Sequence, residues 1–255
     1  DSAPNRRHWL RQGAAAWLTA WAGASPAVAA APPTPPAPPA PSASGRLGFQ
    51  PLAMTAGGAA LQVPTGYTAR LLYSWGDPVG MPGHMPELPP DASHSAADQA
   101  RMAGMHHDGM GWFPLPGPEA PGAAANSRHG LLAVNHEYTD ENLLHPDGMT
   151  GWNAAKTAKS LAALGVSIIE VQAEEPGAGQ PPRWALQRPS RYARRITAGT
   201  PMRIAGPAAG HRMMRTEADP QGLRVLGTFN NCAGGVTPWG TYLTCEENFH
   251  GYFEP

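Results

Sequence analysis

Glycine and proline interrupt the chain so often that long regular helices cannot extend across most of it. The 255 residues include 30 glycines and 30 prolines, about twice the usual share of these two residue types. Proline removes a backbone donor from a helix, and glycine in a helix interior lowers its stability. We therefore expect a mostly β structure with long loops and one or two short helices.

Residues 1–31 have the features of an export signal. Arg6 and Arg7 precede an uncharged, alanine-rich stretch at residues 13–31, and the Ala-Val-Ala at residues 27–29 fits a cleavage site. Paired arginines ahead of a weakly apolar segment are typical of a twin-arginine signal peptide. Alanine and glycine contribute little to membrane transfer, so we expect no stable membrane span.

This signal predicts that the twin-arginine translocase carries the folded protein to the periplasm or the extracellular space. Thiols stay reduced in the cytoplasm, so a thiolate can bind a metal before export. Residues 32–44 are a proline-rich, extended linker, and we place the folded domain at residues 45–255. The net charge of -1, with 15% charged residues, provides no basic surface for nucleic acid.

Several segments of the domain have strand-like composition. We expect strands at residues 67–75, 131–138, 166–172, 183–187, 224–230 and 241–247, and a helix at residues 153–164. Asn153 would cap the start of this helix and Gly165 would end it. Short strands separated by long loops suit an irregular β-propeller better than a sandwich.

The two cysteines, Cys232 and Cys245, lie in the stretch NCAGGVTPWGTYLTCEEN at residues 231–248. A turn at residues 237–240 would place the two cysteines opposite each other in a symmetric hairpin, at a spacing that permits a disulfide. The glycine pair at residues 234–235 favours irregular pairing instead. Two interpretations stay open, a structural disulfide and a metal site.

Acidic residues at two strand ends favour the metal site. One predicted strand ends in Glu246-Glu247, and another ends in Asn135-His136-Glu137. Carboxylates that converge from several strand ends suit calcium, whereas a thiolate suits a softer or higher-valent metal such as iron.

Strand alternation limits how residues 241–247 can contribute. Cys245 and Glu247 would lie on one face and Glu246 on the other, so they cannot all reach one metal unless the strand ends or bulges there. His106-His107-Asp108 is a weaker candidate, because a solvated histidine pair is commoner in a flexible loop.

These motifs resemble the PhoX family of bacterial secreted alkaline phosphatases. The resemblance is carried by NCAGGVTPWGTYLTCEENFHGYF at residues 231–253, LLAVNHEYTDENLLHPDG at 131–148, ITAGTPMRIAGPAAGHRMMRT at 196–216 and HHDGMGWFPL at 106–115. It implies a six-bladed β-propeller, twin-arginine export, and hydrolysis of phosphate monoesters at high pH.

The resemblance also implies a cofactor of Fe³⁺ and Ca²⁺ joined by an oxo bridge, with a cysteine thiolate on the iron. In this scheme an oxo or hydroxo group between the metals is the nucleophile, and no side chain is assigned as catalytic. The residues that match the polar motifs of the family are Glu137, Cys232, Glu246 and Glu247, and Asn135, His136 and Cys245 are further candidates. Cys232 is preferred to Cys245 for iron because it lies in the glycine-rich bend.

Members of this family are substantially longer than the chain. We therefore expect the N-terminal part of a propeller, holding its first two or three blades and inactive by itself, with further ligands after Pro255. Two alternatives remain. One is a phosphodiesterase or phosphotriesterase on the same scaffold, and the other is a non-catalytic exported propeller that binds a ligand and contains a Cys232–Cys245 disulfide.

Overall fold

A computed structural model of the chain describes residues 48–53, 60–116, 126–175, 177 and 183–253. The predicted signal peptide at residues 1–31 and linker at 32–44 lie outside this part. The chain divides into two units, residues 1–67 and 68–255. In the first unit, the Tyr67 hydroxyl donates a hydrogen bond to the Gly48 carbonyl at 3.0 Å. The described helices and strands all belong to the second unit.

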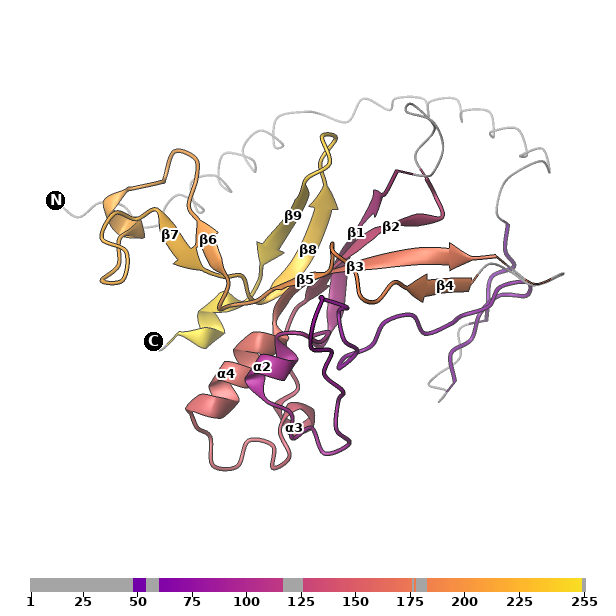
Figure 1. The fold of residues 1–255 in the computed structure, drawn as a ribbon, viewed down its shortest axis with the longest axis horizontal. Coiled ribbons are helices and arrows are strands. Elements are labelled where there is room, and N and C mark those ends of the chain that lie inside the picture. The colour runs from indigo at the N-terminus through magenta and orange to yellow at the C-terminus, as the bar shows by residue number, and fades with distance from the viewer. Residues whose placement is uncertain (1–47, 54–59, 117–125, 176, 178–182, 254–255) are drawn as a thin grey trace, which may run out of the picture. The chain divides into compact units, whose positions relative to one another are not determined.

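The second unit is built on an antiparallel sheet whose main strands follow each other in chain order (Figure 1). Its strands are β1 (His107–Pro114), β2 (His129–His136), β3 (Gly165–Glu174), β4 (Arg183–Leu186) and β5 (Arg194–Ile196). Both β4 and β5 pair with β3, β4 with its second half and β5 with its first half. Four consecutive antiparallel strands are the arrangement of a propeller blade. The mostly β prediction is confirmed, and the six-bladed count stays a prediction.

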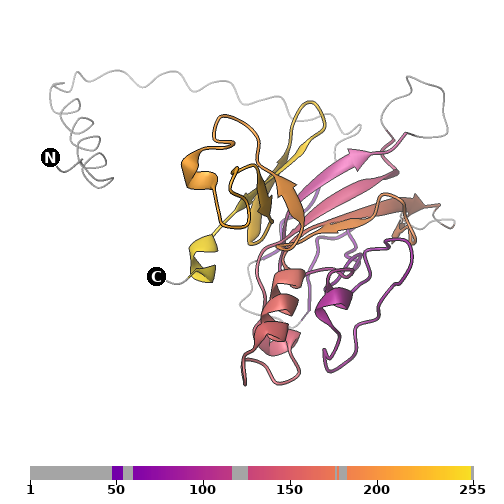
Figure 2. The ribbon, with the colours of Figure 1, turned by 60° about the vertical axis from the view of Figure 1, so that its left-hand side comes forward.

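Two small sheets follow this blade. β6 (Pro201–Arg203) pairs with β7 (Arg224–Leu226), and β8 (Asn231–Val236) pairs with β9 (Tyr242–Glu246). The β8–β9 hairpin, yellow in Figures 1 and 2, lies beside β1 and contacts both β1 and β2. Residues from three parts of the sequence therefore meet along these strands.

The helices lie at one end of the sheet (Figure 1). They are α2 (Ala96–Gln99), α3 (Glu141–Leu144) and α4 (Ala154–Ala163), and 3₁₀ turns follow at Arg212–Met214 and Phe249–Tyr252. α4 is the predicted helix, and the Asn153 side chain accepts hydrogen bonds from the backbone N–H groups of Ala155 and Lys156. The four-residue helices α2 and α3 were not predicted.

The strand predicted at residues 67–75 is wrong. Residues 68–74 are irregular and belong to no ladder. Tyr73 is buried with Val134, Ile169 and Val171 in the main core cluster, and its hydroxyl donates to Ser167 Oγ at 2.9 Å. The apolar residues of this segment thus pack onto the sheet without joining it. Among the described residues, no helix is long and apolar enough to cross a membrane.

His136, the last residue of β2, is fully buried, and its Nε2 lies 2.6 Å from Ser167 Oγ. Burial, followed by the charges of Arg195 and His107, lowers the pKa of His136 well below its ordinary value of 6.5. The imidazole is therefore neutral in the folded protein at neutral pH. It belongs to the packed interior of the blade.

We expect the free energy of unfolding to fall as the pH drops below 6.5, the ordinary pKa of histidine. Below this pH the unfolded chain takes up a proton at His136, whereas the folded chain does not. The contribution of neutral His136 to the free energy of unfolding is therefore fully present above this pH and is lost on acidification. The slope for this one group approaches about 1.4 kcal/mol per pH unit. Urea unfolding of His136→Asn between pH 7 and 5 should show a shallower slope than the wild type, and equal slopes would contradict the assignment.

Candidate metal centre

Three side chains that can bind a cation converge at the ends of three strands. Asp108 is the second residue of β1, Glu137 follows the last residue of β2, and Cys232 is the second residue of β8. One carboxylate oxygen of each acid and the Cys232 Sγ all lie within 4.8 Å of one another. Asp108 is exposed and the other two residues are half-buried, so solvent can reach the group. We call these three residues the acid–thiol cluster.

Two of the three residues lie where a strand ladder is irregular. The register between β1 and β2 shifts between His107 and Met110, which includes Asp108. The register between β8 and β9 shifts between Asn231 and Gly234, which includes Cys232. Such bulges redirect side chains and are common beside active sites. Here they turn Asp108 and Cys232 toward each other from neighbouring strands.

Gly109 lets β1 approach β8 closely enough for this meeting. A Cβ added at Gly109 would lie 2.7 Å from both the Cys232 carbonyl oxygen and the Gly234 nitrogen. Both neighbours are backbone atoms and cannot move aside as a side chain could. The glycine after Asp108 is therefore a packing requirement of the acid–thiol cluster.

The charges around Cys232 oppose the loss of its proton. Hydrogen bonds to the carboxylates of Asp108 and Glu247, with a smaller effect from the charge of Glu137, raise the pKa of the Cys232 thiol to about 12. A thiolate at this point would add a fourth negative charge to those of Asp108, Glu137 and Glu247. A bound cation reverses this balance, because metal ions bind cysteine as the thiolate. The donor set therefore fits a cation.

We expect Asp108→Asn to lower the pKa of the Cys232 thiol, because Asp108 is the largest cause of its elevation. The test uses Cys245→Ser protein treated with a chelator, so that Cys232 is its single thiol. Each unit of lowered pKa raises the thiolate fraction about tenfold. Alkylation by iodoacetamide at pH 8 should be faster with Asp108→Asn, whereas an equal or slower rate would show that Asp108 does not hold the thiol protonated.

Of the predicted metal ligands, Glu137, Cys232 and Glu247 come together. Glu247 follows the end of β9, and its carboxylate, after that of Asp108, raises the pKa of the Cys232 thiol. Glu246 points elsewhere, because its Oε1 accepts hydrogen bonds from Thr228 Oγ1 at 2.6 Å and from the Phe229 N–H at 3.3 Å. The strand thus ends between two adjacent acids that face different neighbours.

Cys245 is not part of the acid–thiol cluster. It is exposed, and both cysteines are free in the structure. The ladder pairs Asn231 with Glu246 and Gly234 with Thr244, so Cys232 and Ala233 both lie opposite Cys245 in a bulge. The glycine pair favoured such irregular pairing, and the Cys232 Sγ lies with the carboxylates of Asp108 and Glu137.

Asn135 and His136 are both buried behind the acid–thiol cluster. The Asn135 Nδ2 donates to the Cys232 carbonyl oxygen at 2.6 Å, so this residue contacts the backbone of Cys232. His136 instead lies with Ser167 in the core of the blade. Neither has its side chain among the three donors.

Sequence reasoning included Asp108 only in the weaker candidate His106-His107-Asp108. The two histidines before it pack against aromatic rings, His106 on Tyr138 at 3.6 Å and His107 on Tyr73 at 5.3 Å between ring centroids. The histidine pair drew attention as the possible ligand, and the carboxylate after it is the group that meets Cys232.

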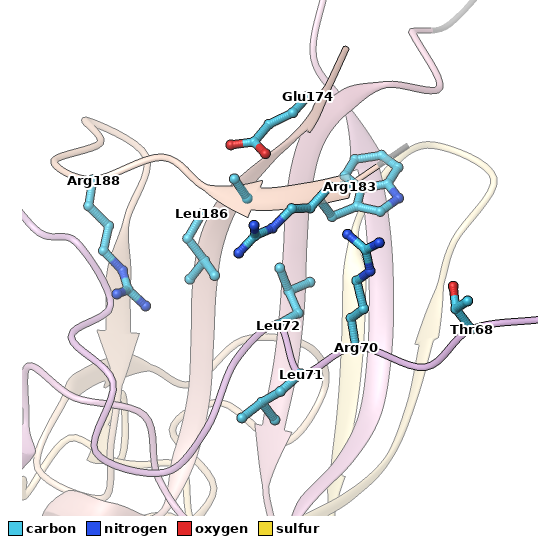
Figure 3. A pocket seen from close by; sticks show the side chains of 10 residues that line it. Thr68, Arg70, Leu71, Leu72, Glu174, Arg183, Leu186 and Arg188 are labelled. Carbon is cyan, nitrogen blue, oxygen red and sulfur yellow. The ribbon is translucent and has the colours of Figure 1, made fainter. Parts of the chain in front are cut away.

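A hollow of about 840 Å³ lies along β4, away from these residues (Figure 3). Arg70, Arg183 and Arg188 give it a basic lining, with Glu174 at its edge. None of the three donors lines it. Its size alone does not make it the reactive site, because the groups that can hold a cation are elsewhere.

The chain is similar to known alkaline phosphatases. A family model described as "Alkaline phosphatase PhoX" matches residues 47–255. Among solved structures, the chain matches Pseudomonas fluorescens PhoX in complex with vanadate, a transition state analogue, with 46% identity and a TM-score of 0.64. The match covers 74% of this chain and 30% of that chain, so the present chain spans less than a third of the length of that protein. A search of curated proteins found no match.

Proposed function

Because this chain belongs to the PhoX family of alkaline phosphatases, we propose that it supplies part of the metal centre of an exported enzyme that hydrolyses phosphate monoesters. The observation that carries the proposal is the convergence of Asp108, Glu137 and Cys232 within 4.8 Å. The similar structure binds vanadate as a transition state analogue, which supports phosphoryl transfer as the reaction. The activity of the whole protein, its substrates and its partners belong to the proposal.

The acid–thiol cluster has donors for two kinds of cation. Carboxylate oxygens of Asp108 and Glu137 suit a hard cation, and we assign them to Ca²⁺. The Cys232 thiolate suits Fe³⁺, and Glu247 is the next carboxylate within its reach. Cations of this kind polarise a phosphoryl oxygen and stabilise the charge that develops on it.

The residues of the chain have two tasks in this scheme. Asp108 and Glu137 hold negative charge at a solvent-accessible position, where a phosphate ester can approach a cation. The carboxylates of Asp108 and Glu247 are the two acceptors that raise the pKa of the Cys232 thiol. They are therefore placed to receive its proton when a cation binds, because the thiol must be deprotonated to act as a ligand.

Export by the twin-arginine translocase belongs to the same proposal. Residues 1–31 would be the signal peptide, 32–44 the linker, and 45–255 the N-terminal part of a propeller phosphatase. Arg6 and Arg7, with the alanine-rich stretch after them, support it. Folding before export would let Cys232 bind its metal in a reducing compartment.

Metal analysis and turnover test the proposed function together. We expect protein that spans the full length of its PhoX relatives to contain iron and calcium, and to hydrolyse p-nitrophenyl phosphate faster than bis-p-nitrophenyl phosphate at alkaline pH. Faster hydrolysis of the diester would favour the phosphodiesterase alternative. Protein that contains neither metal and hydrolyses neither ester would refute the proposal and favour a binding module.

A further inference from the structure

The carboxamide of Asn135 joins three strands behind the acid–thiol cluster. Its Nδ2 donates to the Cys232 carbonyl at 2.6 Å and, more weakly, to the Ala233 carbonyl at 3.4 Å. Its Oδ1 lies 3.0 Å from the Tyr242 hydroxyl and 3.1 Å from Thr244 Oγ1. The side chain therefore connects β2 with both strands of the β8–β9 hairpin.

These partners leave Asn135 no capacity to bind a cation itself. A carboxamide has two N–H donors and an oxygen with two lone pairs. Two carbonyls face the donors, Thr244 Oγ1 donates to the oxygen, and the single Tyr242 hydroxyl proton is shared between Asn135 Oδ1 and the Gly109 carbonyl. The two backbone carbonyls can only accept hydrogen bonds, which fixes the NH₂ group as the end that faces them. Asn135 thus acts on Cys232 through the backbone.

The contact replaces pairing that β8 loses at its bulge. The register shift between Asn231 and Gly234 takes Cys232 and Ala233 out of the ladder with β9, and these are the two residues whose carbonyls Asn135 binds. A bulge without such a partner would leave carbonyl groups unsatisfied close to the core. The Asn135 side chain therefore stabilises the irregular backbone that directs the Cys232 thiol toward the two acids.

The contacts of Asn135 also extend to the segments that carry Asp108 and Glu137. A Cβ at Gly109, next to Asp108, would lie 2.9 Å from the Asn135 Nδ2. The Tyr242 hydroxyl lies 2.9 Å from the Gly109 carbonyl as well as 3.0 Å from Asn135 Oδ1. Glu137 is two residues after Asn135 on the same strand end. One buried side chain thus contacts or adjoins every segment that carries a donor.

A second layer of hydrogen bonds extends this arrangement to Glu246. Asn231 Nδ2 donates to Thr244 Oγ1 at 3.1 Å and to Thr228 Oγ1 at 3.0 Å. Thr228 in turn donates to Glu246 at 2.6 Å. Each threonine hydroxyl can accept one bond and donate another in this chain. Glu246 is connected with Cys232 through this network and has no direct contact with the donors.

We propose that Asn135 is a positioning residue that sets Cys232 against Asp108 and Glu137 and thereby determines how tightly the acid–thiol cluster binds a thiophilic cation. The inference rests on the proposed metal centre and concerns residues that the metal would not contact. Outer partners of metal ligands commonly contribute about 10- to 100-fold to affinity. We expect an effect of that size from the loss of the Asn135 donor.

The experiment is a titration of the 255-residue chain with Co²⁺, followed through the thiolate-to-cobalt charge-transfer band. Asn135→Asp keeps the size of the side chain but replaces the NH₂ donor with a carboxylate oxygen that faces two carbonyls. Asn135→Ala removes both the NH₂ donor and the oxygen acceptor. Both variants should bind Co²⁺ about 10- to 100-fold more weakly than the wild type. Tyr242→Phe removes one hydroxyl without a large cavity and should weaken binding by a smaller factor.

A matched control separates positioning from general loss of stability. Asn153→Ala removes the cap of α4, which should lower the Tm but leave the Co²⁺ dissociation constant unchanged. The proposal is overturned if the Asn135 variants fold and bind Co²⁺ as tightly as the wild type. If they do not fold, Tyr242→Phe decides, and unchanged affinity in that variant overturns the proposal.

The wild-type titration distinguishes this inference from the proposed function. A wild-type protein that gives no thiolate-to-cobalt band refutes the metal centre, and the positioning role with it. A wild-type band that the Asn135 variants retain at the same affinity refutes only the positioning role. A band that weakens in the Asn135 variants and persists in Asn153→Ala supports both.

Discussion

Replacing Cys232 with serine is expected to weaken Co²⁺ binding by more than about 100-fold, because a direct ligand contributes more than the outer partners that give 10- to 100-fold effects. Serine keeps the size of the side chain and a polar oxygen, but its hydroxyl is not deprotonated as a thiol is when a metal binds. The thiolate-to-cobalt band should disappear completely. The affinity that remains would come from the carboxylates of Asp108 and Glu137, which lie within 4.8 Å of the Cys232 Sγ.

Cys245→Ser is the matched control for this change. Cys245 lies in the same hairpin, but it is exposed and is not one of the three donors. The control should keep the band and alter the dissociation constant by less than about twofold. If Cys245→Ser abolishes the band and Cys232→Ser keeps it, the thiolate has been assigned to the wrong cysteine.

In protein that spans the full length of its PhoX relatives, replacing Glu137 with glutamine should lower the hydrolysis of p-nitrophenyl phosphate by about 1,000-fold. The substitution keeps the shape of the side chain and removes its charge, which we assign to holding the cation. Charge stabilisation by a metal contributes several kcal/mol to a transition state, and each 1.4 kcal/mol corresponds to about a factor of ten in rate. The measurement is kcat/KM at saturating metal, compared with the wild type.

Glu175→Gln provides a control at a surface glutamate. Glu175 is exposed and pairs with Arg128 at 2.9 Å, and surface ion pairs contribute little to stability. Its kcat/KM should stay within about twofold of the wild type. Equal activity in Glu137→Gln and Glu175→Gln would exclude Glu137 from the metal centre.

The sequence predicted the parts of the fold that local patterns determine. The helix α4 was found because Asn153 and Gly165 are a recognisable cap and stop, and β2, β3 and β9 because apolar residues dominate them. β1 was missed because residues 107–114 contain two glycines, an aspartate and a proline. Its strand conformation depends on pairing with β2, which is a long-range contact that composition does not record.

The candidate site was predicted in part for the same reason. Glu137 was a candidate because it follows a recognisable strand, and Cys232 because it lies in the glycine-rich bend; both also match the motifs of the PhoX family. Asp108 was ranked below the other candidates because its place depends on two irregular pairings, where β1 lies against β8. The sequence could not separate Glu246 from Glu247, since their difference arises from where β9 ends and which neighbours each side chain meets.

X-ray absorption at the metal edge tests the central claim most directly, because it identifies the atoms around the metal. For the iron-loaded protein we expect one sulfur neighbour among oxygen neighbours, kept in Cys245→Ser and lost in Cys232→Ser. Such a result would place the metal at the acid–thiol cluster. Oxygen and nitrogen neighbours alone in the wild type, or a sulfur neighbour that persists in Cys232→Ser, would contradict the account.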